Sequence, residues 1–430
     1  MLMLIPLGFV RSVVDERGYR YQGVLSEISN SWGNEQTLSG PVLTVPYTEQ
    51  ITTTQTVKDQ NGKSTKEKKT SERHRKAHFL PADLQLHTKL IEEYRNRSIF
   101  STVVFSAAID VEASFDIPDL NTLSENITGI DWDKATVSFG VSDTRAINKV
   151  ESFLWNGKPQ TLSPGTQLTA LPSGFHAKLN NTGVRQTTVP TAETGSTHQL
   201  AMRLNINGSG GLYFTSNGER TRLTMQSSWP HPSFQGDTLP VDRKISSEGF
   251  TATWDIPHLA RNYDQHWLDT KDKPDLFELI TGVSMFEPNS LYSRITRASK
   301  YGVLFISLTF LTLFIFELSI KQRIHLIQYG LIGVSLSLFY LILLSLSEHI
   351  TFVRAYAAAA LTCTAMISLY TAAFLKSAAR GLFVAALLSG LYALLYSLIK
   401  MEDFALLMGT FVLLAVVIVL MVLTRNQRLA

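Results

Sequence analysis

Cysteine is almost absent from this sequence: among 430 residues only Cys363 is a cysteine, and it lies inside a long apolar run. The polar part of the chain can therefore form no internal disulfide and no cysteine-ligated metal site. This excludes zinc fingers and cysteine nucleophiles there. It does not fix the compartment, because a polar region this long can bury a stable core in an oxidising space without disulfide bridges.

Catalytic and cofactor-binding motifs are absent as well. The sequence contains no HExxH helix, no GxSxG nucleophile elbow, no phosphate-binding loop and no dinucleotide fingerprint. Nothing predicts a helix after Gly208-Ser209-Gly210-Gly211 that would present Ser209 as a nucleophile, so this stretch is expected to be a hairpin or a bulge. The sequence thus predicts no enzyme, no catalytic or metal-binding residue and no cofactor.

An excess of charge of one sign is also lacking, since the net charge is only +3. Much of it comes from Lys58 to Lys76, where eight lysines or arginines outweigh three acidic residues. This distribution does not indicate a nucleic-acid partner. The basic run is expected to be a solvated hairpin tip, and contact with anionic lipid headgroups or acidic glycans is the alternative.

Long apolar runs are what the last third of the chain does contain. Each holds about 20 residues, the length at which an α-helix crosses roughly 30 Å of hydrocarbon with its backbone hydrogen bonds satisfied. The sequence therefore predicts an integral membrane protein with a lipid bilayer as its partner and a C-terminal bundle of five helices over residues 300–430. The runs are Tyr301 to Ile320, Leu326 to Leu346, Ala355 to Leu375, Gly381 to Ile399 and Phe404 to Thr424.

The N-terminus, MLMLIPLGFV, resembles the end of a further membrane helix. It lacks the charged start and the cleavage site of a signal peptide. Its ten residues cover about 15 Å as a helix, half of a bilayer. We expect residues 1–14 to be the remnant of an N-terminal transmembrane helix, either half-inserted or completed by the full gene product.

Residues 15–299 are polar, and their apolar positions alternate with period two, as in TVVFSAAIDVEASFDI. This pattern predicts a large antiparallel β-rich domain, a sandwich or a partly rolled sheet. The Asn217-Gly218 pair predicts a hairpin over Leu212 to Met225. One or two helices are expected near Asp255 to Leu279.

Two groups of residues are candidates for function. The first is Trp229-Pro230-His231-Pro232-Ser233-Phe234-Gln235-Gly236-Asp237. The prolines exclude a central strand, so the segment should be rigid and extended. Trp229 and Phe234 either seal the sheet, or they frame a recognition surface with His231 and Asp237 as its polar groups. An unrecognised hydrolytic site at His231 and Asp237 is a third hypothesis.

The second group consists of ionisable residues at the ends of membrane helices. Glu317 and Lys321 are spaced to pair at the membrane interface, and Glu348 and His349 end the second run at the opposite surface. A proton-coupled role of Glu348 and His349 requires that they lie deeper in the membrane or face a cavity of the bundle.

At these residues the chain resembles the bacterial inner-membrane CreD family. The segments that carry the resemblance are QTLSGPVLTVPY, FLPADLQL, VSFGVSDTRAI, SSWPHPSFQGDTLP, RASKYGVLFISLTFLTLFIFE and LSEHITF, which extend from Gln36 to Phe352. The family implies an N-terminal helix, a large periplasmic β domain and a membrane bundle, with no established enzymatic activity. It also implies a role in a cell-envelope stress response, with colicin tolerance and an altered β-lactam response.

The orientation rests on this resemblance, because cytoplasmic and outer loops carry nearly equal basic charge, six residues against five. We therefore expect a multi-pass protein of the bacterial inner membrane with its β domain in the periplasm. The predicted function is a non-enzymatic binding or interaction module, whose partner is an envelope protein or a glycan. The alternative is a small transporter-like bundle with an accessory periplasmic domain. It depends on polar residues of the bundle such as Ser335, Ser337, Tyr340, Thr362, Thr364 and Tyr370.

Overall fold

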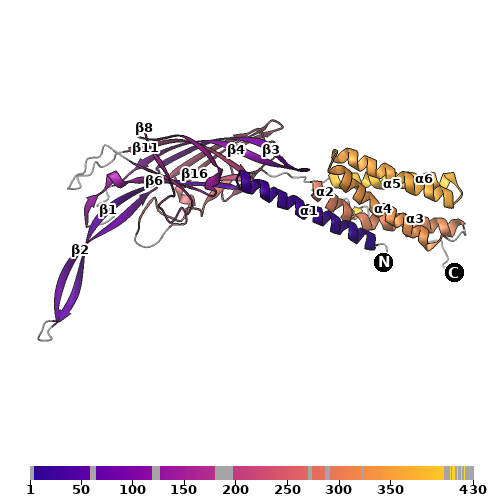
Figure 1. Ribbon diagram of the computed structural model, residues 1–430, viewed down its shortest axis with the longest axis horizontal. Coiled ribbons are helices and arrows are strands. Elements are labelled where there is room, and N and C mark those ends of the chain that lie inside the picture. The colour runs from indigo at the N-terminus through magenta and orange to yellow at the C-terminus, as the bar shows by residue number, and fades with distance from the viewer. Residues whose placement is uncertain are drawn as a thin grey trace. The chain divides into compact units, whose positions relative to one another are not determined.

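The computed structural model describes residues 4–58, 64–118, 126–179, 197–269, 274–285, 291–320 and 324–400, with a few positions between 407 and 421. It divides into two compact units, Leu25–Glu287 and Met1–Val24 with Pro288–Ala430. The first unit is β-rich and the second is helical (Figure 1). The boundaries expected after residues 14 and 299 concern which residues lie in the membrane, and they stay a prediction.

The β unit is a sandwich of two sheets. Sheet A has the order β14-β18-β12-β1-β6-β10-β9, with β2 and β5 also paired to β1 and β17 to β2, and sheet B has the order β15-β16-β13-β3-β4-β11-β7-β8. The strands of sheet A are β1 (Gln36–Lys58), β2 (Ser64–Phe79), β5 (Ile127–Ile130), β6 (Thr136–Val141), β9 (Leu162–Pro164), β10 (Gly174–Lys178), β12 (Gly211–Thr215), β14 (Pro232–Gly236), β17 (His266–Leu268) and β18 (Ile280–Met285). Those of sheet B are β3 (Asp83–Arg97), β4 (Phe100–Asp116), β7 (Ile147–Trp155), β8 (Lys158–Pro159), β11 (Thr197–Ser209), β13 (Arg220–Ser227), β15 (Asp242–Ser246) and β16 (Gly249–Pro257).

The core of the sandwich follows from the period-two pattern. Along β11 and β13 every second residue is buried, so one face of sheet B is dry and the other faces solvent. Residues from both sheets meet in one cluster, for example Phe139 of β6 with Phe153 of β7 in an edge-to-face contact at 6.2 Å between ring centroids. The β-rich, sandwich-like expectation is confirmed.

The expectation of purely antiparallel sheets is wrong, because the sheets are mixed. β1 pairs with β12 in parallel, and β3 pairs with β13 in parallel. The hairpin expected over Leu212 to Met225 is also wrong, since β12 lies in sheet A and β13 in sheet B. Asn217 is fully buried where the chain crosses between the sheets, and its amide donates to the Ser39 and Thr215 hydroxyls. The chain therefore makes a buried crossing between the sheets here and not a tight exposed turn.

Among the described residues of the range Asp255 to Leu279, the helices expected there do not form. β16 continues to Pro257, a 3-10 turn occupies His258–Ala260, and β17 pairs with β2. Local spacing of apolar residues was overridden here by pairing with a strand distant in sequence.

The β1–β2 hairpin is the longest element of the β unit. Its register continues from Leu43↔Phe79 to Lys58↔Ser64, whereas β5 pairs with β1 only as far as Glu49. Beyond that point the described side chains are mostly exposed, and the hairpin protrudes from the β unit (Figure 1). The predicted solvated basic hairpin is present, with Asp59 to Lys63 outside the described residues.

The helical unit contains the C-terminal membrane-type helices. Among the described residues four helical stretches are long and apolar enough to cross a bilayer: Leu291–Ile315, Leu326–Ser347, Phe352–Phe374 and Ala378–Lys400. The fifth predicted run, Phe404 to Thr424, lies mostly outside the described residues. The helices are α2 (Leu291–Lys300), α3 (Gly302–Ile320), α4 (Leu326–Ser347), α5 (Phe352–Phe374) and α6 (Ala378–Lys400).

Helix α1 (Leu4–Trp32) is longer than the apolar N-terminal segment suggested, because it continues through Asp15. Its residues Leu7, Val10 and Val14 are buried at helical spacing, which forms a stripe facing the other helices of this unit. Leu7 lies beside Gly302 of α3.

Small residues bring α5 and α6 together. A Cβ added at Gly381 would lie 2.6 Å from the Ala372 Cβ and 2.9 Å from the Ser368 carbonyl oxygen, so the two backbones approach closely there. Ala355, Ala359 and Cys363 form a fully buried stripe on α5.

Candidate interaction surface

Trp229 anchors the proline-framed segment to the core. Its side chain is 4% exposed, and its indole nitrogen donates a 2.8 Å hydrogen bond to the carbonyl oxygen of His231. The backbone nitrogen of Trp229 donates to the Ser227 hydroxyl at 3.2 Å. The aromatic ring therefore both fills the core and fixes the backbone two residues ahead.

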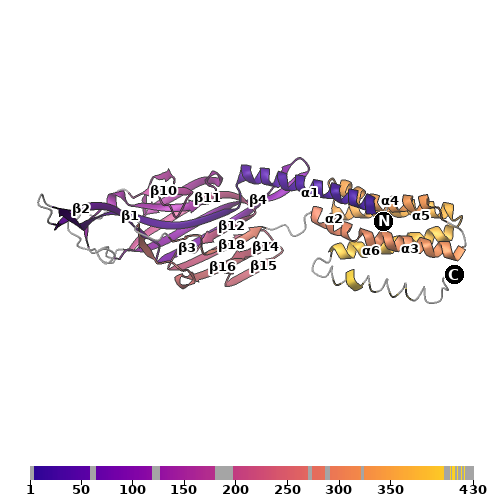
Figure 2. The ribbon, with the colours of Figure 1, turned by 90° about the horizontal axis from the view of Figure 1, so that it is seen from below.

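The segment continues as β14, which lies at the edge of sheet A and, among the described strands, pairs only with β18 (Figure 2). This agrees with the exclusion of a central strand, because Pro232 begins the strand at an edge. Phe234 packs edge-to-face on Phe250 and Trp254, at 5.6 and 5.8 Å between ring centroids. It thus ties the edge of sheet A to residues of sheet B.

The two polar candidates have different environments. His231 is exposed. Asp237 is exposed too, but its carboxylate accepts a 2.9 Å hydrogen bond from the Ile280 nitrogen, and its own nitrogen donates to the Ile280 carbonyl oxygen at 2.8 Å. Gly236 precedes this corner with φ +106°, and a Cβ there would lie 2.2 Å from the Ile280 oxygen. Asp237 therefore holds the end of β14 to β18, whereas His231 is available to a partner.

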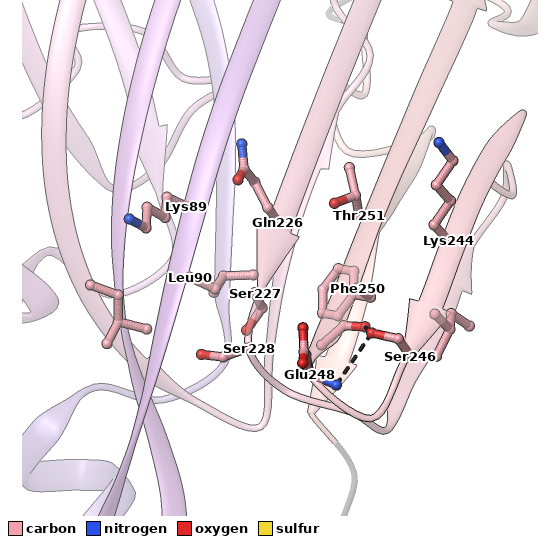
Figure 3. A pocket seen from close by; sticks show the side chains of 13 residues that line it. Lys89, Leu90, Gln226, Ser227, Ser228, Lys244, Ser246, Glu248, Phe250 and Thr251 are labelled. Atoms are coloured by element: carbon pink, nitrogen blue, oxygen red, sulfur yellow. Dashed lines mark hydrogen bonds between the residues drawn. The ribbon is translucent and has the colours of Figure 1, made fainter.

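An open groove begins immediately before Trp229. Its volume is about 390 Å³, and its walls come from β3, β13, β16 and β15 of sheet B (Figure 3). At one end the Ser228 hydroxyl donates to the Glu92 carboxylate at 2.8 Å. Sequence reasoning missed this groove, since its strands are distant in the chain and only their pairing assembles it.

A buried polar network lies at the crossing between the sheets. Arg261 is 7% exposed, donates to the Asn217 carbonyl oxygen at 2.7 Å and lies over the Tyr263 ring. The Tyr263 hydroxyl donates to the Asn217 side-chain oxygen at 2.9 Å. Burial lowers the pKa of Arg261 and raises the pKa of Tyr263. All of these groups face one another, so the network serves to fix the crossing.

The candidate ionisable residues of the helical unit lie near the two ends of α4. The Tyr329 hydroxyl donates to the Glu317 carboxylate at 3.0 Å near the start of α4, and Lys321 lies outside the described residues. Glu348 follows the end of α4 and accepts from the Tyr292 hydroxyl at 3.1 Å. At 1.5 Å per residue the two positions are about 28 Å apart along the helix, so they form no common site.

Glu348 also faces α1. Its carboxylate lies 3.9 Å from the Arg17 guanidinium and is 9% exposed, whereas His349 beside it is exposed. Tyr21 packs against Tyr292 with the rings tilted by 36° and their centroids 5.3 Å apart. Glu348 thus joins three helices of the unit, and His349 is not part of this contact.

No group of three or more metal-binding side chains occurs within the described ranges of the chain. The structure does not bring the two sets of candidate residues into one site. Trp229, His231, Phe234 and Asp237 share one sheet edge of the β unit, and the ionisable residues belong to the helical unit.

Solved structures of an M1 zinc metallopeptidase from Deinococcus radiodurans match 41% of this chain and 38% of their own at 10% identity, with a TM-score of 0.17. A mutant of that enzyme bound to a Tyr-Ser-Ala substrate gives a TM-score of 0.19 with the same coverage. Scores this low carry no argument about fold or function.

Sequence comparison is decisive. The family described as "Inner membrane protein CreD" matches residues 1–429. The curated protein "Inner membrane protein CreD" of Escherichia coli (strain K12) is 34% identical over 428 residues, which cover 99% of this chain and 90% of that protein. The chain therefore belongs to the CreD family of inner membrane proteins.

Proposed function

We propose that this protein acts without catalysis in a cell-envelope stress response, with its β unit in the periplasm as an interaction module. The observation that carries the proposal is the edge of sheet A at β14. An edge strand presents unpaired backbone groups on which an extended segment of a partner can add as a further strand. Here the edge is held rigid by Trp229, Phe234 and Asp237, while His231 faces solvent.

The helical unit supports this function better than transport. The candidate carboxylates Glu317 and Glu348 lie near the ends of α4, where a mid-membrane relay would not place them. Two of the polar side chains on which transport would depend are bonded within their own helix: the Ser335 and Ser337 hydroxyls each donate to the carbonyl four residues earlier. Thr371 of α5 does the same. These bonds are typical of packing residues.

The orientation can be tested with fusions. A phosphatase that is active only in the periplasm should be active when inserted after Ser209 of the β unit and silent when inserted at His325, before α4. A silent fusion at Ser209 with an active one at His325 would place the β unit in the cytoplasm and overturn the proposed function.

The interaction can be tested by crosslinking in intact membranes. A photo-reactive residue in place of Gln235, which is exposed on β14, should capture an envelope protein or a glycan. The matched control is the same residue in place of Lys158. It is exposed on β8, the edge strand of sheet B at the end away from β15 and β16. Equal capture at both positions would contradict an interface at β14.

The cellular role can be tested with His231→Ala. This substitution should leave protein abundance unchanged and remove the colicin tolerance or altered β-lactam response that the intact gene confers. Retention of the full phenotype would restrict the segment to a structural role.

A further inference from the structure

The solvent-facing side of sheet B carries an unusual row of side chains across its strands. Residues paired directly across neighbouring strands lie on the same face. The register pairs Lys149 with Asn205, Asn205 with Ala108, Ala108 with Lys89, Lys89 with Gln226, Gln226 with Thr251, and Thr251 with Lys244. One row therefore crosses seven strands from β7 to β15, with a lysine at each end and one in the middle.

The spacing of the lysines is regular. Lys149 and Lys89 are three strands apart, and so are Lys89 and Lys244, which corresponds to about 14 Å for each interval. All three side chains are exposed. Figure 3 shows the half of the row from Lys89 through Gln226 and Thr251 to Lys244, along the open groove.

The charges of the row are not neutralised. Within the part of the chain that the structure describes, Lys89, Lys149 and Lys244 form no ion pair, whereas neighbouring cations on this face do: Arg203 with Asp110, and Arg220 with Asp255. Between the lysines, Gln226 and Thr251 offer an amide and a hydroxyl group, whereas the Asn205 amide nitrogen already donates to the Glu151 carboxylate at 2.8 Å. The row thus combines spaced cations with hydrogen-bonding groups suited to hydroxyls.

We propose that this row binds a linear acidic glycan laid across the strands of sheet B. The proposal rests on the periplasmic placement proposed above and gives its interaction module a second surface and a ligand class. Carboxylate or phosphate groups of the glycan meet the lysines, and its hydroxyls meet the amides and the threonine between them. The groove between Lys89 and Lys244 seats part of the chain.

The flanking residues favour a narrow chain over a membrane surface. Asp110 and Asp242 lie in the adjacent row, which the register continues through His87, Thr224 and Thr253. Two further carboxylates are closer: Glu151 accepts from Asn205 of the row, and Glu248 lines the groove. A broad anionic plane would meet these carboxylates as well as the lysines. A single chain along the row avoids Asp110 and Asp242 and meets fewer carboxylates than a plane would.

Binding can be measured with the full-length protein in neutral maltoside micelles. Alginate, a linear polymer of uronic acids, is the probe, and dextran is its neutral counterpart. We expect salt-sensitive binding of alginate and none of dextran. Alginate disaccharides should bind more weakly than longer oligomers, because they cannot extend over the interval of about 14 Å between two lysines.

The decisive variant replaces Lys89, Lys149 and Lys244 with glutamine. Exposed ion pairs are individually weak, so we expect alginate affinity to fall about tenfold. Replacing Lys66, Lys68 and Lys69 of the β1–β2 hairpin with glutamine changes the net charge equally and should leave affinity unchanged. Arginine at the three row positions should retain binding, which separates loss of charge from misfolding.

The proposal is overturned if the row variant binds alginate as well as the unaltered protein, if the hairpin variant loses as much affinity, or if the row is needed for anionic phospholipid vesicles and not for alginate. A silent phosphatase fusion at Ser209 would instead overturn the proposed function, whatever the protein binds in micelles. The two failures are therefore distinguishable.

Discussion

At the scale of single residues, two buried side chains of the β unit combine core packing with a hydrogen bond. His78 is 3% exposed, shares a 3.0 Å hydrogen bond with the Thr44 hydroxyl and stacks on Trp267. Trp229 uses its indole nitrogen in the same way. Each of these side chains stabilises the β unit both by the area it buries and by its hydrogen bond. Substitutions test these contributions.

Trp229→Ala should destabilise the β unit by about 3–5 kcal/mol, because it opens a cavity in the core and removes the bond to the His231 carbonyl. Thermal unfolding and protein abundance in membranes measure the loss. Asp237→Ala should cost about 1–2 kcal/mol through the bond to Ile280. His231→Ala is the control, since its side chain is exposed. Unchanged unfolding of the Trp229 variant would disprove the anchor.

Stability of the β unit should depend on pH through His78. Burial lowers the pKa of His78 from 6.5 to about 4, so the folded state keeps this imidazole neutral while the unfolded chain protonates it. Above about pH 6.5 this imidazole is neutral in both states and does not reduce the free energy of unfolding. As the pH falls toward 4, the free energy of unfolding decreases by about 3 kcal/mol in total, because only the unfolded chain binds the proton.

Unfolding of the unaltered protein and of His78→Gln, followed between pH 7 and pH 4.5, tests this dependence. The variant should lose less stability than the unaltered protein across that interval. His74→Gln, at an exposed position on the same strand, should behave like the unaltered protein. Parallel pH profiles for the unaltered protein and His78→Gln would refute the assignment.

At the scale of elements, local sequence patterns predicted the individual strands and helices better than they predicted which strands pair. Period-two alternation predicted the strands, the apolar runs predicted α3 to α6, and Pro230 and Pro232 predicted that β14 would not be central. The parallel pairs β1–β12 and β3–β13 were not predictable, because partner choice depends on residues far apart in the chain. The hairpin turn predicted from Asn217-Gly218 was wrong for the same reason, because Asn217 is buried and bonded to Ser39, which is far away in the sequence.

The candidate residues show a similar division. The proline frame was visible in the sequence, but the use of Asp237 as a link to Ile280 was not, because β18 lies 43 residues away. The lysine row was equally hidden. Its members are unremarkable in sequence and become a row only through the register of seven strands.

The alanine stripe of α5 gives a test of helix packing. Ala359 is fully buried, whereas Ala357 on the same helix is exposed. Ala359→Leu should destabilise the helical unit by about 1–3 kcal/mol through overpacking, and Ala357→Leu should have little effect. Thermal stability in detergent measures both. If the two variants behave alike, the buried stripe does not determine how α5 packs.

At the scale of the whole molecule, the two compact units have separate cores. The large hydrophobic cluster of the sandwich draws only on residues between Leu38 and Met285, all inside the unit Leu25–Glu287. A core of this size belongs to a unit of roughly 260 residues, which exceeds the length that most domains need to fold alone.

Residues 25–287 expressed alone should therefore be water-soluble and unfold in one cooperative transition. Circular dichroism should show β structure, and the unfolding midpoint should match that of the β unit in the full chain. Aggregated or unfolded material at low protein concentration would show that the β unit needs the helices for its stability.

The protruding β1–β2 hairpin has an electrical consequence. From Glu49 to Lys58 the ribbon extends about 30 Å beyond its last pairing with β5, several times the ~8 Å over which charges act in physiological salt. Lys66, Lys68 and Lys69, which pair with Thr56, Thr54 and Thr53, lie beyond this point by more than that screening length and are thus screened from the rest of the β unit. They form a separate positively charged surface. Its electrostatic attraction for anions acts independently of the attraction exerted by the lysines of sheet B.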